Sequence, residues 1–389
     1  MSFSINTISR KPFFNNERVI ITIYIIACVL ISLKVAFIDS YDNYDCFVAS
    51  FEHLKKQYDL YLMYPSEYHT EYNYSPLFAF GMGLFYYLPD WLGILLWNLT
   101  HTIALLLAIK MMPIELKKKI FVYWFCLIEY ITAAENVQTN ATVAALIILV
   151  YLYQEKKQTT WSSLFFAFGF FFKIYVLTAG VFWICYKKRG SFFVKGLAWA
   201  VLFFSLPLFI VPLDHLIFLY QSWFHRLQLQ TIRDSLSLIG VIGMFKSIQI
   251  DQLWIVLFGT ISMLLVLFKK EVYHNPQFRQ LYLGGILLFT VVFNPGVESP
   301  SYIIAVAGAA IWYISLERVK WHQWLMVLVF IFTCLSPTEL FPRYLREQFL
   351  KPYHIKAIPC IIVWVVCMIE LFTWNKRKIE PSVNLTSFG

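Results

Sequence analysis

The chain has 389 residues, of which 59% are hydrophobic, 19% aromatic and only 14% charged. An ordinary soluble domain carries about 25% charged residues, and one soluble core of this length cannot bury so much apolar surface. Composition and long apolar blocks therefore exclude a soluble enzyme, a DNA-binding module, a disordered chain and a disulfide scaffold. The net charge of +9 then reflects how Lys and Arg are distributed around a membrane, not binding to nucleic acid.

Apolar blocks with roughly the length of a membrane-spanning helix, about 20 residues, recur along the chain. They predict an all-α polytopic membrane protein with about twelve transmembrane helices, built as a single integral membrane domain over residues 1–389. The blocks cover residues 19–38, 91–112, 119–134, 139–154, 160–173, 174–186, 191–212, 252–268, 280–294, 301–316, 321–336 and 355–374.

One further apolar stretch, residues 76–88, is too short to cross a membrane and is closed by Leu88-Pro89-Asp90. If it crossed, Lys117–Lys119 and all later basic residues would change sides. If it stays outside, Lys and Arg occupy nearly every short loop on one face, as the positive-inside rule requires. We therefore predict an outer interfacial helix at 76–88, with residues 1–18 and 375–389 both cytoplasmic.

The outer face is predicted to carry three long segments, residues 39–90, 213–251 and 337–354. They hold aromatic residues, carboxylates and the remaining basic residues, where water meets lipid. The functional polar groups of a membrane enzyme are expected at this level. Two simpler interpretations remain open, since solvated loops and a belt of interfacial tyrosines have the same composition.

Three carboxylates follow the first span, in the sequence Asp39-Ser-Tyr-Asp42-Asn-Tyr-Asp45. A carboxylate at the membrane surface can act as a general base that takes a proton from an attacking hydroxyl. The spacing of three residues would place the carboxylates on one face if this stretch is helical. Asp39, Asp42 and Asp45 are all candidates, and each is also compatible with a solvated acidic loop.

Lys173 lies between two apolar stretches, in Gly-Phe-Phe-Phe-Lys173-Ile174-Tyr175. A lysine in such a place either extends to the membrane surface or faces a polar cavity. The predicted topology puts it near the outer end of its span, where its point charge can meet a lipid phosphate. Further candidate polar residues on the outer side are Asn136, Gln138 and Asn140 in a turn between two spans, Arg226, Arg233 and Ser235 in the second outer segment, and Glu298 and Arg343 in later connections.

Several short motifs follow one another in a recognisable order. The Asp after the first span is followed by Tyr72-Asn73-Tyr74-Ser75-Pro76, then Leu95-Leu96-Trp97-Asn98, Asn136-Val137-Gln138-Thr139-Asn140, Lys173-Ile174-Tyr175 and Asp234-Ser235-Leu236. Over about residues 39 to 240, this order resembles glycosyltransferase family 87 of the GT-C superfamily. The chain departs from the family pattern where Ser75 replaces the first Pro of a Tyr-Pro-Pro motif and Val176 replaces a Pro.

The resemblance implies a GT-C type architecture and an inverting hexosyltransferase in the plasma (inner) membrane, with its active site on the outer face. The implied partners are a polyprenyl-phosphate-linked sugar, with mannose as the leading candidate, a lipid or glycan acceptor and membrane lipids. The family pattern implies that Asp42, seven residues before Ala49, is the base. In the mechanism that follows, Lys173 with Arg226 or Arg233 would hold the donor phosphate, and Tyr74, Asn136, Gln138, Asn140 and Ser235 are further candidates for binding the donor phosphate or sugar. Neither a metal nor another cofactor is expected.

The competing class is a multispan transporter or flippase for lipids or glycans. In such a protein we expect ionisable residues at mid-span and internal repeats. Glu129 lies about two thirds of the way along its predicted span, and no clear repeat is evident. A membrane acyltransferase is a second enzyme alternative, but it would need a membrane-embedded His beside an Asn or Asp, and the histidines lie mainly in loops or span ends. A purely structural membrane protein also remains open.

Overall fold

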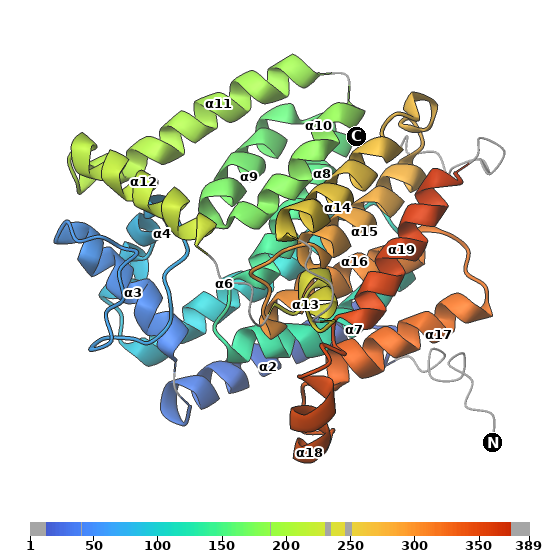
Figure 1. The fold of residues 1–389 in the computed structure, drawn as a ribbon, viewed down its shortest axis with the longest axis horizontal. Coiled ribbons are helices and arrows are strands. Elements are labelled where there is room, and N and C mark those ends of the chain that lie inside the picture. Colours follow the sequence, from blue (N-terminus) through green and yellow to red (C-terminus); the bar gives the residue numbers. More distant parts are fainter. Residues whose placement is uncertain (1–12, 40, 187, 230–234, 246–250, 375–389) are drawn as a thin grey trace.

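The computed structural model describes residues 13–39, 41–186, 188–229, 235–245 and 251–374 (Figure 1). Helices joined by short connections make up this part of the chain, and no β-strand occurs among the described residues. The predicted all-α class is confirmed. Most of the predicted cytoplasmic ends, residues 1–12 and 375–389, lie outside the described residues, so the orientation of the termini stays a prediction.

Every predicted apolar block is helical in the structure. Three of these helices, Glu17–Phe37, Asp90–Met111 and Arg189–Phe209, are long and apolar enough to cross a membrane. Helix Leu116–Glu135 has 20 residues but does not meet this criterion, and eight further apolar helices have 10–17 residues. The fold is consistent with a helical membrane protein, and the number of spans stays a prediction. The helices are α2 (Glu17–Phe37), α6 (Asp90–Met111), α7 (Leu116–Glu135), α8 (Asn140–Glu155), α9 (Thr159–Phe172), η1 (Ile174–Val181) with α10 (Phe182–Cys185), α11 (Arg189–Ser205) with η2 (Leu206–Phe209), α14 (Gln252–Val266), α15 (Pro276–Val292), α16 (Tyr302–Ser315), α17 (Lys320–Leu328) with the π-helical η5 (Val329–Leu335), and α19 (Ile358–Phe372).

The segments predicted to lie on the outer side are themselves largely folded. The stretch 76–88 forms α4 (Pro76–Gly81) and α5 (Gly83–Tyr86). Its start is fixed by the Ser75 hydroxyl, which accepts a hydrogen bond from the Phe78 amide, and by Pro76 in the first turn. The remaining short elements are α3 (Asp42–Lys55), α12 (Leu213–Gln228), α13 (Leu238–Gly243), η3 (Lys270–Val272), η4 (Ser299–Ser301), α18 (Arg343–Leu345) and the π-helical η6 (Arg346–Leu350).

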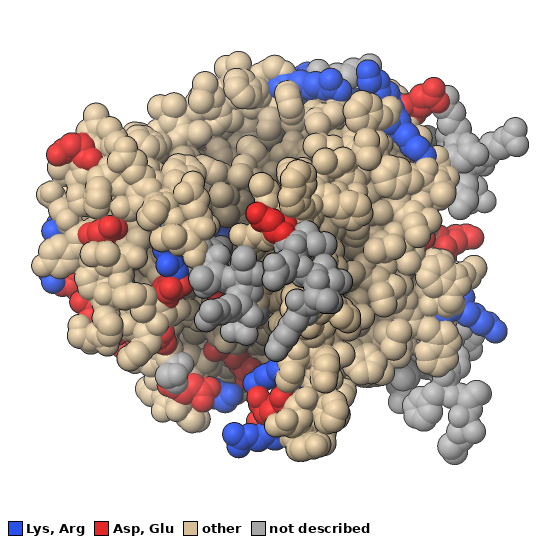
Figure 2. All heavy atoms as spheres, in the orientation of Figure 1, with Lys and Arg blue, Asp and Glu red and all other residues tan. Residues whose placement is uncertain are grey.

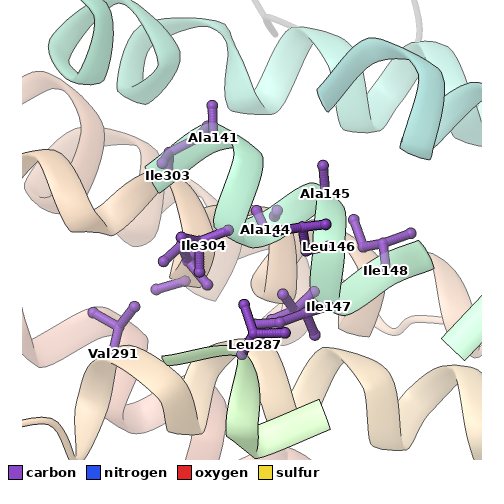
Figure 3. Packing of buried hydrophobic residues seen from close by; sticks show 14 of the residues in the cluster. Ala141, Ala144, Ala145, Leu146, Ile147, Ile148, Leu287, Val291, Ile303 and Ile304 are labelled. Carbon is purple, nitrogen blue, oxygen red and sulfur yellow. The ribbon is translucent and has the colours of Figure 1, made fainter. Parts of the chain in front are cut away.

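The centre of the molecule is the group α8, α15 and α16, whose side chains are buried almost all round. Figure 3 shows Ala144 and Ile147 of α8 among Leu287, Ile303 and Ile304 of the neighbouring helices. Helices α15 and α16 touch through glycines. A methyl group added at Gly284 would lie 3.0 Å from the Gly308 carbonyl oxygen, so only glycine permits this approach.

The periphery is different, because α11 lies at the edge of the bundle (Figure 1) and exposes Phe193, Val194, Leu197 and Val201. A soluble protein rarely leaves so large an apolar face uncovered. Figure 2 shows that uncharged residues make up most of one face of the molecule, with charged side chains mainly toward its edges. Both observations fit a helical bundle surrounded by lipid.

Candidate functional site

A cavity of about 290 Å³ brings together residues from six separate parts of the chain. Four side chains predicted from the sequence line it: Tyr74, Gln138, Lys173 and Glu298. The full lining consists of Asn43, Phe47, His69, Thr70, Glu71, Asn73, Tyr74, Gln138, Lys173, Ile174, Tyr175, Leu227, Gly296, Glu298 and Ser301. We refer to this space as the polar cavity.

Lys173 supplies a cation to the wall of the polar cavity, at the point where α9 ends and η1 begins. Its ammonium donates a hydrogen bond to the Asn140 side-chain oxygen at 2.9 Å. It also lies 5.5 Å from the ring centre of Tyr74 and 4.8 Å from that of Tyr175, distances at which an aromatic ring stabilises a cation. An ammonium has three N–H donors, so Lys173 retains donors for an anionic ligand.

The turn between α7 and α8 contributes Gln138 to the cavity wall and leads to Asn140, the hydrogen-bond partner of Lys173. Val137 has φ = 52°, a left-handed conformation that is strained for a β-branched residue. The Val137 carbonyl accepts a hydrogen bond from the Trp97 indole at 3.0 Å, and the Asn136 carbonyl accepts one from the Asn43 side chain at 3.0 Å. These bonds hold the strained turn in place, and the next residue, Gln138, lines the polar cavity.

The three candidate carboxylates are in different surroundings. Asp42 begins α3 and accepts a 2.7 Å hydrogen bond from the amide of His69. Asp42 itself does not line the polar cavity, but its hydrogen-bond partner His69 and its neighbour Asn43 both do. Asp39 instead forms an ion pair with Lys34 at 3.3 Å, beyond the end of α2.

Asp45 lies one helical turn beyond Asp42 and two residues from both Asn43 and Phe47, which line the polar cavity. A separation of two residues directs Asp45 away from Asn43 and Phe47, and its separation of three from Asp42 puts the two carboxylates on the same side of α3. Partial burial and the charges of Asp90 and Asp42 raise the pKa of the Asp45 carboxyl to about 6. In the described part of the chain, no three His, Cys, Asp or Glu side chains form a metal-binding group.

Arg226 contacts the residues of the wall and does not line the cavity itself. It forms an ion pair with Glu71 and donates a 3.1 Å hydrogen bond to the Asn73 side chain. Both partners line the polar cavity. Helix α12 therefore holds the segment before α4 in position, and the predicted role of Arg226 in phosphate binding stays a prediction.

The other predicted residues lie at or beyond the edge of the polar cavity. Asn140 contacts it only through Lys173, and the Asn136 side chain donates to the Thr132 carbonyl at 2.8 Å. Ser235 is buried against the Asn294 carbonyl, and Arg343 is exposed on α18. Arg233 lies outside the described residues.

Sequence reasoning did not identify several residues of the cavity wall. Asn43 lies on α3, whereas His69, Glu71 and Asn73 reach the cavity because the segment between α3 and α4 folds back along α3. Asn43 stands next to Asp42, a signal that was available in the sequence. The positions of His69 and Glu71 depend on the path of an irregular segment, which periodicity does not describe.

An apolar groove of about 250 Å³ adjoins the polar cavity. The two spaces share Ile174, Tyr175 and Leu227. The rest of the groove is lined by Thr178, Val256, Phe289, Thr290, Phe293, Asn294 and Pro295. A molecule with a polar head and an apolar tail would therefore find both environments side by side.

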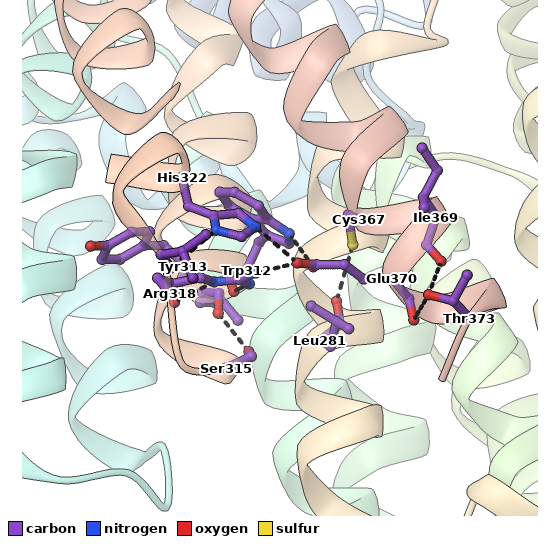
Figure 4. Close-up of polar contacts among 12 residues, drawn as sticks. Leu281, Trp312, Tyr313, Ser315, Arg318, His322, Cys367, Ile369, Glu370 and Thr373 are labelled. Atoms are coloured by element: carbon purple, nitrogen blue, oxygen red, sulfur yellow. Dashed lines mark hydrogen bonds and ion pairs between the residues drawn. The ribbon is translucent and has the colours of Figure 1, made fainter. Parts of the chain in front are cut away.

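A second polar cluster lies at the other end of α16 (Figure 4). Glu370 pairs with Arg318 and accepts a 2.7 Å hydrogen bond from the Trp312 indole, while His322 lies 3.4 Å away. Arg318 also donates to the Tyr313 carbonyl at 2.9 Å. We call this group the Arg318 cluster. Its polar groups face one another and join α16, α17 and α19.

Comparison with known families identifies one match. The family model described as glycosyltransferase family 87 matches residues 72–337, more than half of the chain. The matched stretch includes Lys173, Gln138 and Glu298 of the polar cavity, and the three carboxylates after the first span precede it. No curated protein matches the chain.

Proposed function

This chain belongs to glycosyltransferase family 87, and from that premise we propose that it moves a hexose, with mannose as the first candidate, from polyprenyl phosphate to a hydroxyl group. The acceptor is a lipid or glycan on the outer face of the membrane, and the architecture is of the GT-C type. The observation that carries this proposal is the polar cavity with a lysine in its wall, directly adjoining an apolar groove.

A lipid-linked sugar phosphate fits these two spaces because each part meets its own kind of surface. The sugar lies in the polar cavity among Gln138, Glu298 and Asn73, which offer hydrogen-bond donors and acceptors. The phosphate lies beside Lys173, and the first isoprene units lie in the apolar groove. Tyr175 belongs to both spaces, and it marks the boundary between sugar phosphate and lipid.

The proposed reaction is a single displacement at the anomeric carbon. Asp42 takes the proton of the acceptor hydroxyl while that oxygen forms a bond to the anomeric carbon, and the bond from this carbon to the phosphate oxygen breaks. Lipid phosphate leaves with the electron pair of that bond, and the Lys173 ammonium stabilises its growing negative charge. Attack from the face opposite the phosphate inverts the anomeric configuration, as it does in inverting glycosidases.

A purified-protein assay tests the donor class. The protein in detergent or vesicles receives radiolabelled polyprenyl-phosphate mannose, with total membrane lipids as acceptors, and a parallel reaction receives nucleotide-linked mannose. We expect label in a new lipid product only from the polyprenyl-phosphate donor. Polyprenyl-phosphate glucose and galactose in further reactions identify the preferred hexose, and the anomeric configuration of the product tests inversion.

Two results would overturn the proposal. Transfer from the nucleotide-linked mannose alone would show that the donor is a nucleotide sugar and not a polyprenyl-phosphate sugar. Movement of intact polyprenyl-phosphate mannose across the vesicle membrane, without any new glycosidic product, would assign the chain to the lipid transporters. A glutaraldehyde-fixed or boiled sample is the control for both measurements, because it retains lipid but lacks a functional polar cavity.

A further inference from the structure

A buried ion pair lies behind the wall of the polar cavity. The Lys356 ammonium is 2.8 Å and 3.1 Å from the two carboxylate oxygens of Glu129. The two side chains are 6% and 0% exposed. Glu129 belongs to α7 and Lys356 lies just before α19, so the pair joins two elements that are distant in the sequence.

The third contact of Lys356 leads to the cavity. Its ammonium also donates a 2.8 Å hydrogen bond to the Ser299 hydroxyl. Ser299 begins η4 and stands between Glu298 and Ser301, which both line the polar cavity. The Ser301 amide donates to the Glu298 carbonyl at 3.0 Å and closes the turn. Lys356 therefore contacts the back of the turn whose front forms the cavity wall.

Stability alone is a weak reason for this arrangement. Burial of two charges costs several kcal/mol of desolvation for each ion. A protein in which apolar residues of similar volume replace such a pair is often equally stable. The ammonium has three N–H donors, and Glu129 and Ser299 accept three hydrogen bonds from it. The Tyr302 ring, 5.1 Å away, occupies another side of the cation. Lys356 is thus positioned to hold protein groups, not a ligand.

We propose that the Glu129–Lys356 pair is a positioning device for the cavity wall. It fixes Ser299, and through the turn 298–301 it directs Glu298 and Ser301 toward the bound sugar. Neither Glu129 nor Lys356 touches the substrate. The consequence for substrate binding rests on the proposed glycosyltransferase function, whereas the fixation of the turn does not.

The test changes the contact to the turn and leaves the ion pair intact, because loss of either charge would leave the other buried without a partner. Ser299→Ala removes the hydroxyl that accepts from Lys356, and Ser299→Thr retains a hydroxyl. The matched control is Thr333→Val, which removes a 2.8 Å hydrogen bond from Thr333 to the backbone carbonyl of the same lysine. Thr333 is fully buried and does not line the polar cavity.

Two measurements are made on the full-length protein. Hydrogen–deuterium exchange of residues 296–302 should be about tenfold faster in Ser299→Ala, the effect of losing one hydrogen bond to a charged group. It should be unchanged in Thr333→Val and largely restored in Ser299→Thr. With radiolabelled polyprenyl-phosphate mannose as donor, we expect the KM of Ser299→Ala to rise about tenfold, with kcat within about twofold.

The two measurements separate the inference from the proposed function. Unchanged exchange in Ser299→Ala, or equal increases in Ser299→Ala and Thr333→Val, would overturn the positioning role whether or not the protein transfers sugar. Faster exchange in Ser299→Ala with an unchanged KM would mean that the ion pair fixes the backbone of the turn but does not affect donor binding. That result would overturn the link to binding. Absence of transfer by the wild type would count against the proposed function alone.

Discussion

The polar cavity and the Arg318 cluster lie at opposite ends of α16 and contain the same kinds of residues. Each combines a cation, a carboxylate and aromatic rings. In the Arg318 cluster, Glu370 accepts from Arg318 and Trp312, and Arg318 also donates to backbone carbonyls. In the polar cavity, Lys173 and Glu298 face an open volume of about 290 Å³.

Residue type alone therefore does not identify a binding site in this protein. Groups that use their hydrogen bonds on one another join helices, as in the Arg318 cluster, and leave nothing for a substrate. Groups that retain donors and acceptors toward an open space can bind one. The comparison predicts that mutations in the polar cavity reduce the transfer rate, whereas mutations in the Arg318 cluster reduce stability.

The largest effect is expected at Asp42. Asp42→Asn keeps the shape and the hydrogen bond from the His69 amide but removes the proposed base. We expect the initial rate of transfer to fall by about 10² to 10⁴, with the thermal unfolding temperature changed by no more than a few degrees. Equal rates in wild type and Asp42→Asn would show that another group is the base. Glu298→Gln and Asp39→Asn, measured in the same assay, test the remaining carboxylates.

The next effect is expected at Lys173. Lys173→Gln removes the cation and retains a hydrogen-bond donor, so the growing charge on the lipid phosphate loses its partner. Loss of one such stabilising donor typically costs about 10² to 10³ in kcat. Steady-state kinetics with the polyprenyl-phosphate donor measures this change. A rise in KM with an unchanged kcat would mean that Lys173 binds the donor equally in the ground state and the transition state.

Glu370→Gln is the counterpart in the Arg318 cluster. It leaves Arg318, whose side chain is 4% exposed, without its carboxylate. We expect the free energy of unfolding to fall by about 1–3 kcal/mol, with kcat of the folded protein within about twofold of wild type. Thermal unfolding in detergent and the transfer assay provide both values. A hundredfold loss of kcat at unchanged stability would contradict the contrast between the two ends of α16.

The smallest effect is expected at Asp45 and depends on pH. Its pKa is raised to about 6 from the ordinary value of 3.8, so the folded protein holds this proton more tightly than the unfolded chain. The resulting stabilisation is complete below pH 3.8 and is lost as pH rises through 6. Asp45→Asn stays neutral, so its unfolding temperature should exceed that of wild type above pH 6. The two proteins should converge near pH 4.

The activity of Asp45→Asn provides the matching check. We expect transfer at pH 7.5 to remain within about fivefold of wild type, since it is Asp42 that accepts a hydrogen bond from the amide of the cavity-lining His69. A loss as large as that of Asp42→Asn would identify Asp45 as the base. In that case the rate of the wild-type enzyme should decline below about pH 6.

The helices were predictable because apolar blocks and proline-flanked turns are local signals. The family resemblance and the choice of Tyr74, Gln138, Lys173 and Glu298 among the candidate residues were also accessible from the sequence. The roles of His69 and Glu71 were not, because they depend on how an irregular segment folds back on α3. The pairing of Glu129 with Lys356 was also inaccessible. Glu129 alone suggested a transport residue, and its partner is 227 positions away.

The glycine contact between α15 and α16 has a consequence for how this protein can diverge. Gly284 and Gly308 hold the two backbones so closely that neither position accepts a side chain without displacement of the other helix. Residues above and below that contact are not so constrained. Under the proposed function, a change of preferred sugar would therefore arise from substitutions in the wall around Glu298, while this helix pair stays unchanged.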